Sequence, residues 1–277
     1  MQKKLGITVI LVLLSCSYLF CFNIPSAKAV TVNDTIHIRA DGSVTPLSAP
    51  ITKNGYVYTL TSNISFPTNY DGIVIERDNV VLDGAGYSIK QNGQLDGITL
   101  VGRHNVTIRN LVIKDFYWGI FLNHSSGCTI TRTELTVAMY SIYLLDSSNN
   151  KIYHNNMITH RMYIYNSTNT WDDGYPSGGN YWSDYPASLD TNGDGIGEQP
   201  YELLSTTNNI NVDRYPRVNI LVVSEFSNLL QNIAFITLFT VVLTIVRLRF
   251  HSPKAADSNP AKYRFTVQKK MNSHALR

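Results

Sequence analysis

The chain has 277 residues, of which 44% are hydrophobic and 16% are charged, and its formal net charge is +3. The segment from residue 247 to residue 277 holds eight Lys or Arg and one Asp, so it contributes +7 (8 − 1) and the rest of the chain carries −4 (3 − 7). Outside that segment there is no basic surplus for a nucleic-acid surface, and we expect no nucleic-acid partner.

The first predicted element, residues 1–29, is a secretory signal peptide. Two lysines precede a long apolar run (residues 5–22), and an Ala-Lys-Ala sequence ending at Ala29 suits a cleavage site. The apolar run is long for a signal, so an uncleaved anchor is the alternative. Two of the three cysteines lie in this segment, which leaves Cys128 without an intrachain disulfide partner in the mature chain.

Residues 30–71 are expected to form a leading strand and a cap over the first coil of the repeat that follows. Pro46, Pro50 and Pro67 interrupt short strand-like pieces in this segment. A solenoid buries the apolar face of each coil against the next coil, so its ends need a cover of this kind.

A short pattern recurs through residues 72–170 and predicts the architecture of this region. Its five copies are separated by 25, 22, 22 and 20 residues: Gly72-Ile73-Val74-Ile75, Gly97-Ile98-Thr99-Leu100, Gly119-Ile120-Phe121-Leu122, Ser141-Ile142-Tyr143-Leu144 and Arg161-Met162-Tyr163-Ile164. Two further apolar columns keep the period: Leu82, Ile108, Ile130 and Ile152; and Ile113, Leu135 and Met157. Such a period is typical of a solenoid, and three columns indicate three short strands per coil. We therefore predict an all-β parallel β-helix of about five coils, stacked ~4.8 Å apart.

The register of these coils places aromatic side chains on one outer face. The row one step after the inward Ile column contains Val74, Thr99, Phe121, Tyr143 and Tyr163, and the row two residues before it contains Asp96, Trp118, Tyr140 and His160. Stacked rings at coil spacing would present a flat, weakly polar platform to the face of a sugar. Cross-strand aromatic pairs also stabilise a sheet by ~0.2–1 kcal/mol each without any ligand. A glycan platform and a structural ladder both remain open.

Two groups of polar residues could take part in metal binding. His124 and Asp146 fall side by side on adjacent coils, which suits a hydrogen bond, a metal half-site or an acid–base pair, but a stacked polar ladder that satisfies turn backbone is the simpler interpretation. A copper site would recruit imidazole and thioether groups from His154, Met157, His160 and Met162. Both methionines fall on inward columns and are expected in the core, which argues against copper.

Residues 171–217, rich in Trp, Tyr, Gly and Asp, are expected to cap the far end of the coils, and they contain a loop that is similar to an EF-hand loop. Oxygen donors occupy its positions 1, 3 and 5, Gly195 follows at position 6, and a backbone carbonyl is available at position 7. Position 12 is Tyr201 rather than the bidentate Glu, so another carboxylate must complete the shell. We predict a calcium site formed by Asp190, Asn192, Asp194, Ile196 and Glu198, with a turn that binds nothing as the alternative.

A single transmembrane helix is predicted in residues 218–248. The stretch from Leu229 to Val246 has 18 residues without a charge, which is just long enough to span a bilayer. The basic tail, residues 249–277, is then expected in the cytoplasm by the positive-inside rule. We therefore expect a single-pass protein of the cell membrane whose β-helix is extracellular or periplasmic; a buried core helix is the alternative.

Several motifs resemble the NosD-type family of right-handed β-helix repeat proteins, which are exported. They lie within residues 35–217 and comprise His37-Ile38-Arg39-Ala40-Asp41-Gly42-Ser43-Val44, Glu76-Arg77-Asp78-Asn79-Val80-Val81-Leu82-Asp83-Gly84-Ala85-Gly86-Tyr87, Gly178-Gly179-Asn180-Tyr181-Trp182-Ser183-Asp184-Tyr185, Asp190-Thr191-Asn192-Gly193-Asp194-Gly195-Ile196-Gly197 and Asp213-Arg214-Tyr215-Pro216. The resemblance implies a right-handed parallel β-helix and says little about chemistry. The family's name comes from a periplasmic protein that helps to load copper into nitrous oxide reductase, and related repeats occur in carbohydrate-binding proteins and sugar hydrolases.

These features favour a non-catalytic binding or surface protein for glycans or envelope partners. Polysaccharide-cleaving β-helix enzymes need clustered carboxylates, and the only adjacent acidic pair, Asp172-Asp173, lies in a turn after the last coil. The sequence shows no triad, phosphate loop or zinc spacing. Two alternatives remain: a copper-handling accessory protein of the NosD type, and a carbohydrate-active lyase or hydrolase.

Overall fold

The computed structural model describes residues 28–93, 95–159, 161–207 and 209–223. The expected signal peptide, the transmembrane segment and the basic tail therefore lie outside the described residues, except for residues 28–29 and 218–223. Within the described ranges, no helix is long and apolar enough to cross a membrane.

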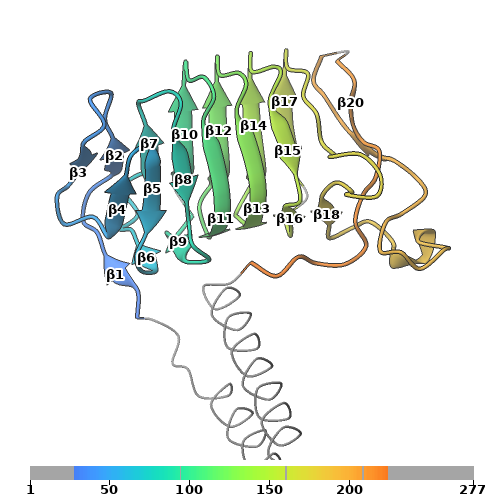
Figure 1. Cartoon of the computed structure of the whole chain (residues 1–277), viewed down its shortest axis with the longest axis horizontal. Helices are drawn as coiled ribbons and strands as arrows, with labels where there is room; N and C mark the ends of the chain where they lie inside the picture. The colour runs from blue at the N-terminus through green and yellow to red at the C-terminus, as the bar shows by residue number, and fades with distance from the viewer. Residues whose placement is uncertain (1–27, 94, 160, 208, 224–277) are drawn as a thin grey trace, which may run out of the picture. The chain divides into compact units, whose positions relative to one another are not determined.

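Successive turns of the chain stack side by side in a parallel β-solenoid of the right-handed type, with about six turns (Figure 1). Each full turn contributes strands to three faces. The first face is a seven-stranded sheet, parallel except for the pairing of its edge strand β3 with β2. In spatial order its strands are β3 (Val44–Thr45), β2 (Ile36–Ile38), β7 (Ile73–Ile75), β10 (Asp96–Val101), β12 (Trp118–Asn123), β14 (Tyr140–Leu145) and β17 (Met162–Tyr165).

The second and third faces belong to one 11-stranded sheet, because β11 (Thr107–Lys114) and β13 (Thr129–Thr136) contribute to both. The first half of β11 pairs with β8 and its second half with β9. The other strands of the second face are β4 (Ile51–Asn54), β5 (Val57–Leu60), β8 (Val81–Asp83) and β15 (Lys151–Tyr153). Those of the third face are β1 (Val30–Thr31), β6 (Ile64–Ser65), β9 (Ser88–Lys90), β16 (Asn156–Met157) and β18 (Tyr181–Trp182).

The three apolar columns of the sequence point into the solenoid. Ile98, Ile120 and Ile142 stand opposite one another in adjacent strands of the first face and are fully buried. The columns through Ile130 and Leu135 are buried in the same way on the second and third faces. The predicted three-strand register is therefore confirmed, and the core is a continuous stack of aliphatic side chains.

The solenoid has about one turn more than the sequence repeat indicates. Strand β2 lies parallel to β7, with Ile36 opposite Ile73 and Ile38 opposite Ile75. Ile36 precedes Ile73 by 37 residues (73 − 36), because the antiparallel β4–β5 hairpin lengthens this turn beyond the common period. The segment expected to be a leading strand is thus a rung of the solenoid, and the prediction of about five coils was too low.

Buried polar side chains stack from turn to turn and satisfy the backbone at the corners. In one ladder, the N–H of Thr133 donates to Asn155 Oδ1 at 3.0 Å, and the N–H of Asn155 donates to Asn180 Oδ1 at 3.1 Å. The N–H of Asn180 then donates to Asp213 Oδ2 at 2.7 Å. A side chain from one turn therefore replaces the backbone partner that a corner in the next turn lacks.

Residues 171–217 cover the far end of the stack. They contain the short 3₁₀ helix η1 (Ala187–Leu189) and the antiparallel pair β19 (Tyr201–Leu203) and β20 (Asn211–Asp213). Trp171 and Trp182 are fully buried beneath this pair. Their indole N–H groups donate to Asn211 Oδ1 and Asp213 Oδ2, each at 2.9 Å. Strand β20 thus supplies the terminal acceptors at this end.

Candidate functional site

The predicted aromatic rows lie side by side on the outer surface of the first face. Pairing of β10, β12 and β14 aligns Asp96, Trp118 and Tyr140 in one row. The neighbouring row aligns Thr99, Phe121, Tyr143 and Tyr163 across β10, β12, β14 and β17. All the rings in these two rows are half-buried. We call the five aromatic residues the aromatic strip: Trp118, Phe121, Tyr140, Tyr143 and Tyr163.

The rings of the aromatic strip interlock instead of forming the expected flat platform. Tyr143 and Tyr163 are stacked, with ring centroids 4.3 Å apart and planes inclined by 18°. Trp118 packs on Tyr143 at 4.4 Å and 30°, whereas Phe121 meets the same Tyr143 edge-on at 5.3 Å and 82°. Such pairs contribute about 0.5–1.5 kcal/mol beyond their burial, so the strip stabilises the sheet whatever else it does.

An acidic pair continues the aromatic strip toward β7. The Asp96 N–H donates to Asp71 Oδ1 at 3.1 Å, and the Thr99 hydroxyl lies 3.4 Å from Asp96 Oδ2. Burial and then the charge of Asp71 raise the pKa of Asp96 to about 7, against the opposing effect of Thr99. Asp71 is not among the predicted residues, although it stands two residues before Ile73 as Asp96 does before Ile98. Applying the same offset one turn earlier would have found it.

The strip combines apolar surface with a few polar groups, as sites for small molecules usually do. Its tyrosines provide phenolic hydroxyls, and burial and then Tyr163 raise the pKa of Tyr143, so this hydroxyl stays protonated at neutral pH. The indole Nε1 of Trp118 is buried and has no hydrogen-bond partner among the described residues. Asp96 adds a carboxyl group that can accept a hydrogen bond, or donate one when protonated.

The second predicted pair, His124 and Asp146, forms part of a polar ladder at a corner. Both residues have positive φ, 49° and 48°, as does Asn166 on the next turn at 45°. His124 Nε2 lies 3.7 Å from Asp146 Oδ2, and Asn166 Nδ2 donates to Asp146 Oδ1 at 2.7 Å. The adjacency is confirmed, and the Asn166 contact favours the structural interpretation.

Three of the four residues considered for copper, His154, Met157 and Met162, lie in the described part of the chain. Met157 is fully buried in the core, as predicted, and Met162 packs partly buried against it. His154 donates through Nε2 to the Ser177 carbonyl at 2.9 Å, and His160 lies outside the described residues. In the described part of the chain, no group of three or more His, Cys, Asp or Glu side chains is placed to hold a metal ion. The placement of Met157 therefore confirms its predicted position in the core.

The predicted calcium loop is held by hydrogen bonds from its own backbone. Asp190 Oδ1 accepts from the N–H of Gly193 at 2.7 Å, and its Oδ2 accepts from Gly195 at 2.9 Å. Asp194 Oδ1 accepts from the N–H of Ile196, which lowers the pKa of Asp194, and Glu198 accepts from the N–H of Thr191, which lowers its pKa. Three charged carboxylates are thereby gathered in one loop.

These three carboxylates do not by themselves form a complete set of calcium ligands. Among the described residues, no three His, Cys, Asp or Glu side chains lie close enough together to hold a metal ion. A calcium ion would also need the amide oxygen of Asn192 and the carbonyl oxygen of Ile196, which are oxygen donors of the kind that calcium prefers. The donor chemistry therefore fits calcium, but the convergence of the ligands is incomplete.

Comparison with known families adds one result. A family model described as periplasmic copper-binding protein (NosD) matches residues 26–187. This range includes all the rungs of the solenoid and the whole aromatic strip, and it ends before the acidic loop. No curated protein and no solved structure matches the chain.

Proposed function

The chain belongs to the NosD family, and from that premise we propose that it is a non-catalytic protein of the cell envelope that binds glycans through its aromatic strip. The observation that carries this proposal is the contiguous arrangement of Trp118, Tyr143 and Tyr163, whose rings contact one another across three turns. A ridge of half-exposed rings beside hydroxyl and carboxyl groups suits the alternating apolar and polar surface of a sugar.

The surroundings of the strip support this use over a purely structural one. The core beneath it is already filled by aliphatic residues such as Ile120 and Ile142, so the outer rings are not needed to close the solenoid. Asp96 places a carboxyl group beside the rings, which a structural ladder does not require. The acidic end also distinguishes this face from a uniformly apolar surface.

Replacing Tyr143 with alanine is expected to weaken glycan binding at least about tenfold, because Tyr143 contacts Trp118, Phe121 and Tyr163 at the centre of the strip. A glycan array with the purified full-length protein identifies the ligand, and calorimetry with the best glycan then measures the change. Tyr143→Phe retains the ring and is expected to bind more tightly than Tyr143→Ala.

Tyr153→Ala is the matched control, because Tyr153 lies on the second face of the same turn and outside the strip. It is expected to leave glycan binding unchanged. If no glycan binds the wild-type protein, or if Tyr143→Ala changes only thermal stability, the strip is a structural ladder. Release of new reducing ends by the wild-type protein but not by Asp96→Asn would instead make the protein a carbohydrate-active enzyme.

Copper handling is the second candidate, and the family description favours it. Among the described residues no group of three or more His, Cys, Asp or Glu is placed to hold a metal ion, so this candidate draws on His160, which lies outside them. Metal analysis of protein purified in the presence of copper tests this candidate. Retention of copper that His160→Ala abolishes and His124→Ala leaves intact would place the site near β17 and replace the glycan proposal.

We propose calcium as a stabilising ligand of the loop around Asp190. Adding calcium is expected to raise the melting temperature of the full-length protein and chelation to lower it, because a ligand that binds only the folded state stabilises it by ~2.7 kcal/mol at 100 times its Kd. The loop carries three carboxylates at Asp190, Asp194 and Glu198, and within the described residues none of them forms a salt bridge. Differential scanning fluorimetry measures the shift.

Asp190→Asn supplies the comparison for this experiment. An amide at position 190 keeps an oxygen acceptor for the loop backbone but removes a charge, so the variant is expected to fold and to lose most of the calcium response. An equal response in wild type and variant would show that calcium acts elsewhere.

The same family assignment supports a location outside the cytoplasm. We propose that the solenoid faces the extracellular or periplasmic side, and that residues 229–246 anchor it as a single transmembrane helix. The long uncharged stretch and the basic segment after it support this arrangement.

A further inference from the structure

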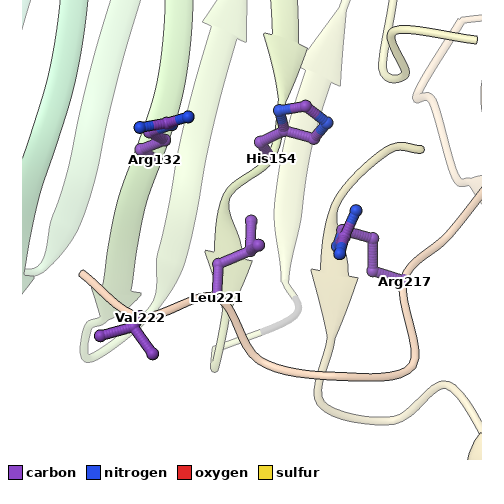
Figure 2. A pocket seen from close by; sticks show the side chains of 5 residues that line it. All are labelled: Arg132, His154, Arg217, Leu221 and Val222. Atoms are coloured by element: carbon purple, nitrogen blue, oxygen red, sulfur yellow. The ribbon is translucent and has the colours of Figure 1, made fainter. Parts of the chain in front are cut away.

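A cavity of about 210 Å³ lies over a corner of the solenoid, away from the aromatic strip. Figure 2 shows the side chains that line it: Arg132, His154, Arg217, Leu221 and Val222. Three of these carry nitrogen donors and come from segments far apart in the sequence. The cavity therefore gathers cationic groups that neither the glycan nor the copper proposal uses.

Arg132 and His154 are neighbours because they occupy the same corner of adjacent turns. Their backbones adopt the left-handed conformation, with φ of 51° and 57°, and the Arg132 N–H donates to the His154 carbonyl at 2.9 Å. Adjacent turns of a solenoid lie ~4.8 Å apart, so the two side chains leave the surface side by side. A non-glycine residue at such a φ is uncommon, and here the turn-to-turn pairing holds it in place.

Arg217 reaches the same place from the segment that follows β20. Its backbone N–H donates to the Asn180 carbonyl at 2.8 Å. Its Nη1 donates at 3.0 Å to the Ser177 carbonyl, the same oxygen that accepts from His154 Nε2 at 2.9 Å. This shared acceptor fixes the guanidinium beside the imidazole, and Arg217 Nε is buried without a hydrogen-bond partner among the described residues.

The last described segment covers one side of the cavity. The Leu221 N–H donates to Asn156 Oδ1 at 2.8 Å, and Asn156 Nδ2 donates to the Leu221 carbonyl at 2.7 Å. This reciprocal pair holds the chain against the solenoid, so Leu221 and Val222 line the cavity beside the charged groups, as Figure 2 shows. Apolar side chains on this side reduce the access of water and strengthen electrostatic attraction beside them.

The charges in the cavity are not balanced within the described residues. No described Asp or Glu forms a salt bridge with Arg132 or Arg217. Asp173 contacts this region only indirectly, because it accepts from the Ser177 hydroxyl and not from either arginine. Two guanidinium groups that face one cavity repel each other, and an anion between them removes this repulsion.

We propose that this cavity binds a small oxyanion, such as the carboxylate of an acidic sugar or a phosphate group. Guanidinium groups present paired N–H donors that match the oxygens of carboxylate and phosphate. In the proposed complex, Arg132 and Arg217 contact the anion from two sides of the cavity. The volume of about 210 Å³ suits a single anionic group with a small substituent.

Titration calorimetry with the full-length protein tests the proposal, using inorganic phosphate, glucuronate and neutral glucose as separate probes. Phosphate and glucuronate are expected to bind and glucose is not. Arg132→Gln is expected to weaken anion binding at least about tenfold, because it removes a charge-assisted contact. Arg132 is exposed, so this variant is expected to fold. Arg161→Gln, which removes an exposed arginine elsewhere, is expected to bind as the wild type does.

Binding of glucuronate alone would support the cavity as a site for acidic sugars, and binding of phosphate alone would support a site for free phosphate. Absence of binding by both anions overturns the proposal. So does an equal loss in Arg132→Gln and Arg161→Gln, because it would show attraction to overall charge rather than to this cavity. The strip variant Tyr143→Ala separates the two sites, since it is expected to leave phosphate binding intact.

Discussion

Replacing Asp213 with alanine is expected to lower the free energy of unfolding by about 3–5 kcal/mol, because it leaves several buried donors without acceptors. Asp213 is fully buried and accepts from the Asn180 N–H, the Trp182 indole N–H and the Tyr215 N–H, at 2.7, 2.9 and 3.2 Å. Urea denaturation followed by tryptophan fluorescence measures the change. A loss below about 1 kcal/mol would mean that water replaces the carboxylate and that the end of the solenoid is open.

Asp213→Asn separates the hydrogen bonds from the charge. Burial raises the pKa of Asp213 to about 7, although the N–H donors from Asn180, Trp182 and Tyr215 oppose this. The unfolded value is about 3.9, so the stabilising effect of the protonated group is complete below pH ~4 and is lost as pH rises through 7. The difference in free energy of unfolding between the wild type and Asp213→Asn should therefore shrink as pH rises from about 4 through 7. A difference in free energy of unfolding that grows as pH rises would contradict the raised pKa of Asp213.

The repeat in the sequence was sufficient to predict the register of the core and the position of the aromatic strip. A period of two within strands and about 22 residues between turns determines which side chains face inward, and this does not depend on loop structure. The same columns predict Met157 in the core, where it is fully buried. Where an inserted hairpin breaks the period, as between β2 and β7, the prediction missed a rung.

The contacts that depend on the cap could not be predicted in this way. Arg217 reaches His154 only because the segment after β20 runs back along the outside of the stack, and no periodicity records that path. The tilt of the rings in the aromatic strip could not be predicted either, because the spacing of residues in the sequence determines only which rings are neighbours. Asn211 and Asp213 end the buried ladders from a separate strand, so their partners are known only once the fold is known.

Gly119→Ala is the second substitution with a large expected effect, with a loss of about 3 kcal/mol in the free energy of unfolding. A Cβ atom on Gly119 would lie 2.5 Å from the carbonyl oxygen of Ser141 and 2.6 Å from Leu135 Cδ2. Neither neighbour can yield easily, because the Ser141 backbone belongs to the next turn and Leu135 belongs to the core. A Cβ atom on Gly97 would likewise lie 2.5 Å from the carbonyl oxygen of Gly119. The glycine in the repeated pattern thus reflects close approach between turns.

Ser141→Ala is the appropriate control, because Ser141 occupies the same column one turn later and already carries a Cβ atom. It removes only the hydroxyl that donates to the Thr159 carbonyl, so we expect the free energy of unfolding to fall by less than about 1.5 kcal/mol. Thermal unfolding of both variants gives the comparison. Equal losses of stability in the two variants would show that any change in this column destabilises the protein and that close packing at Gly119 is not the reason.

A loss of stability confined to Gly119→Ala would establish that the separation of adjacent turns, rather than side-chain chemistry, selects glycine here. The aromatic strip lies directly outside this column, so that separation also sets the distance between its rings.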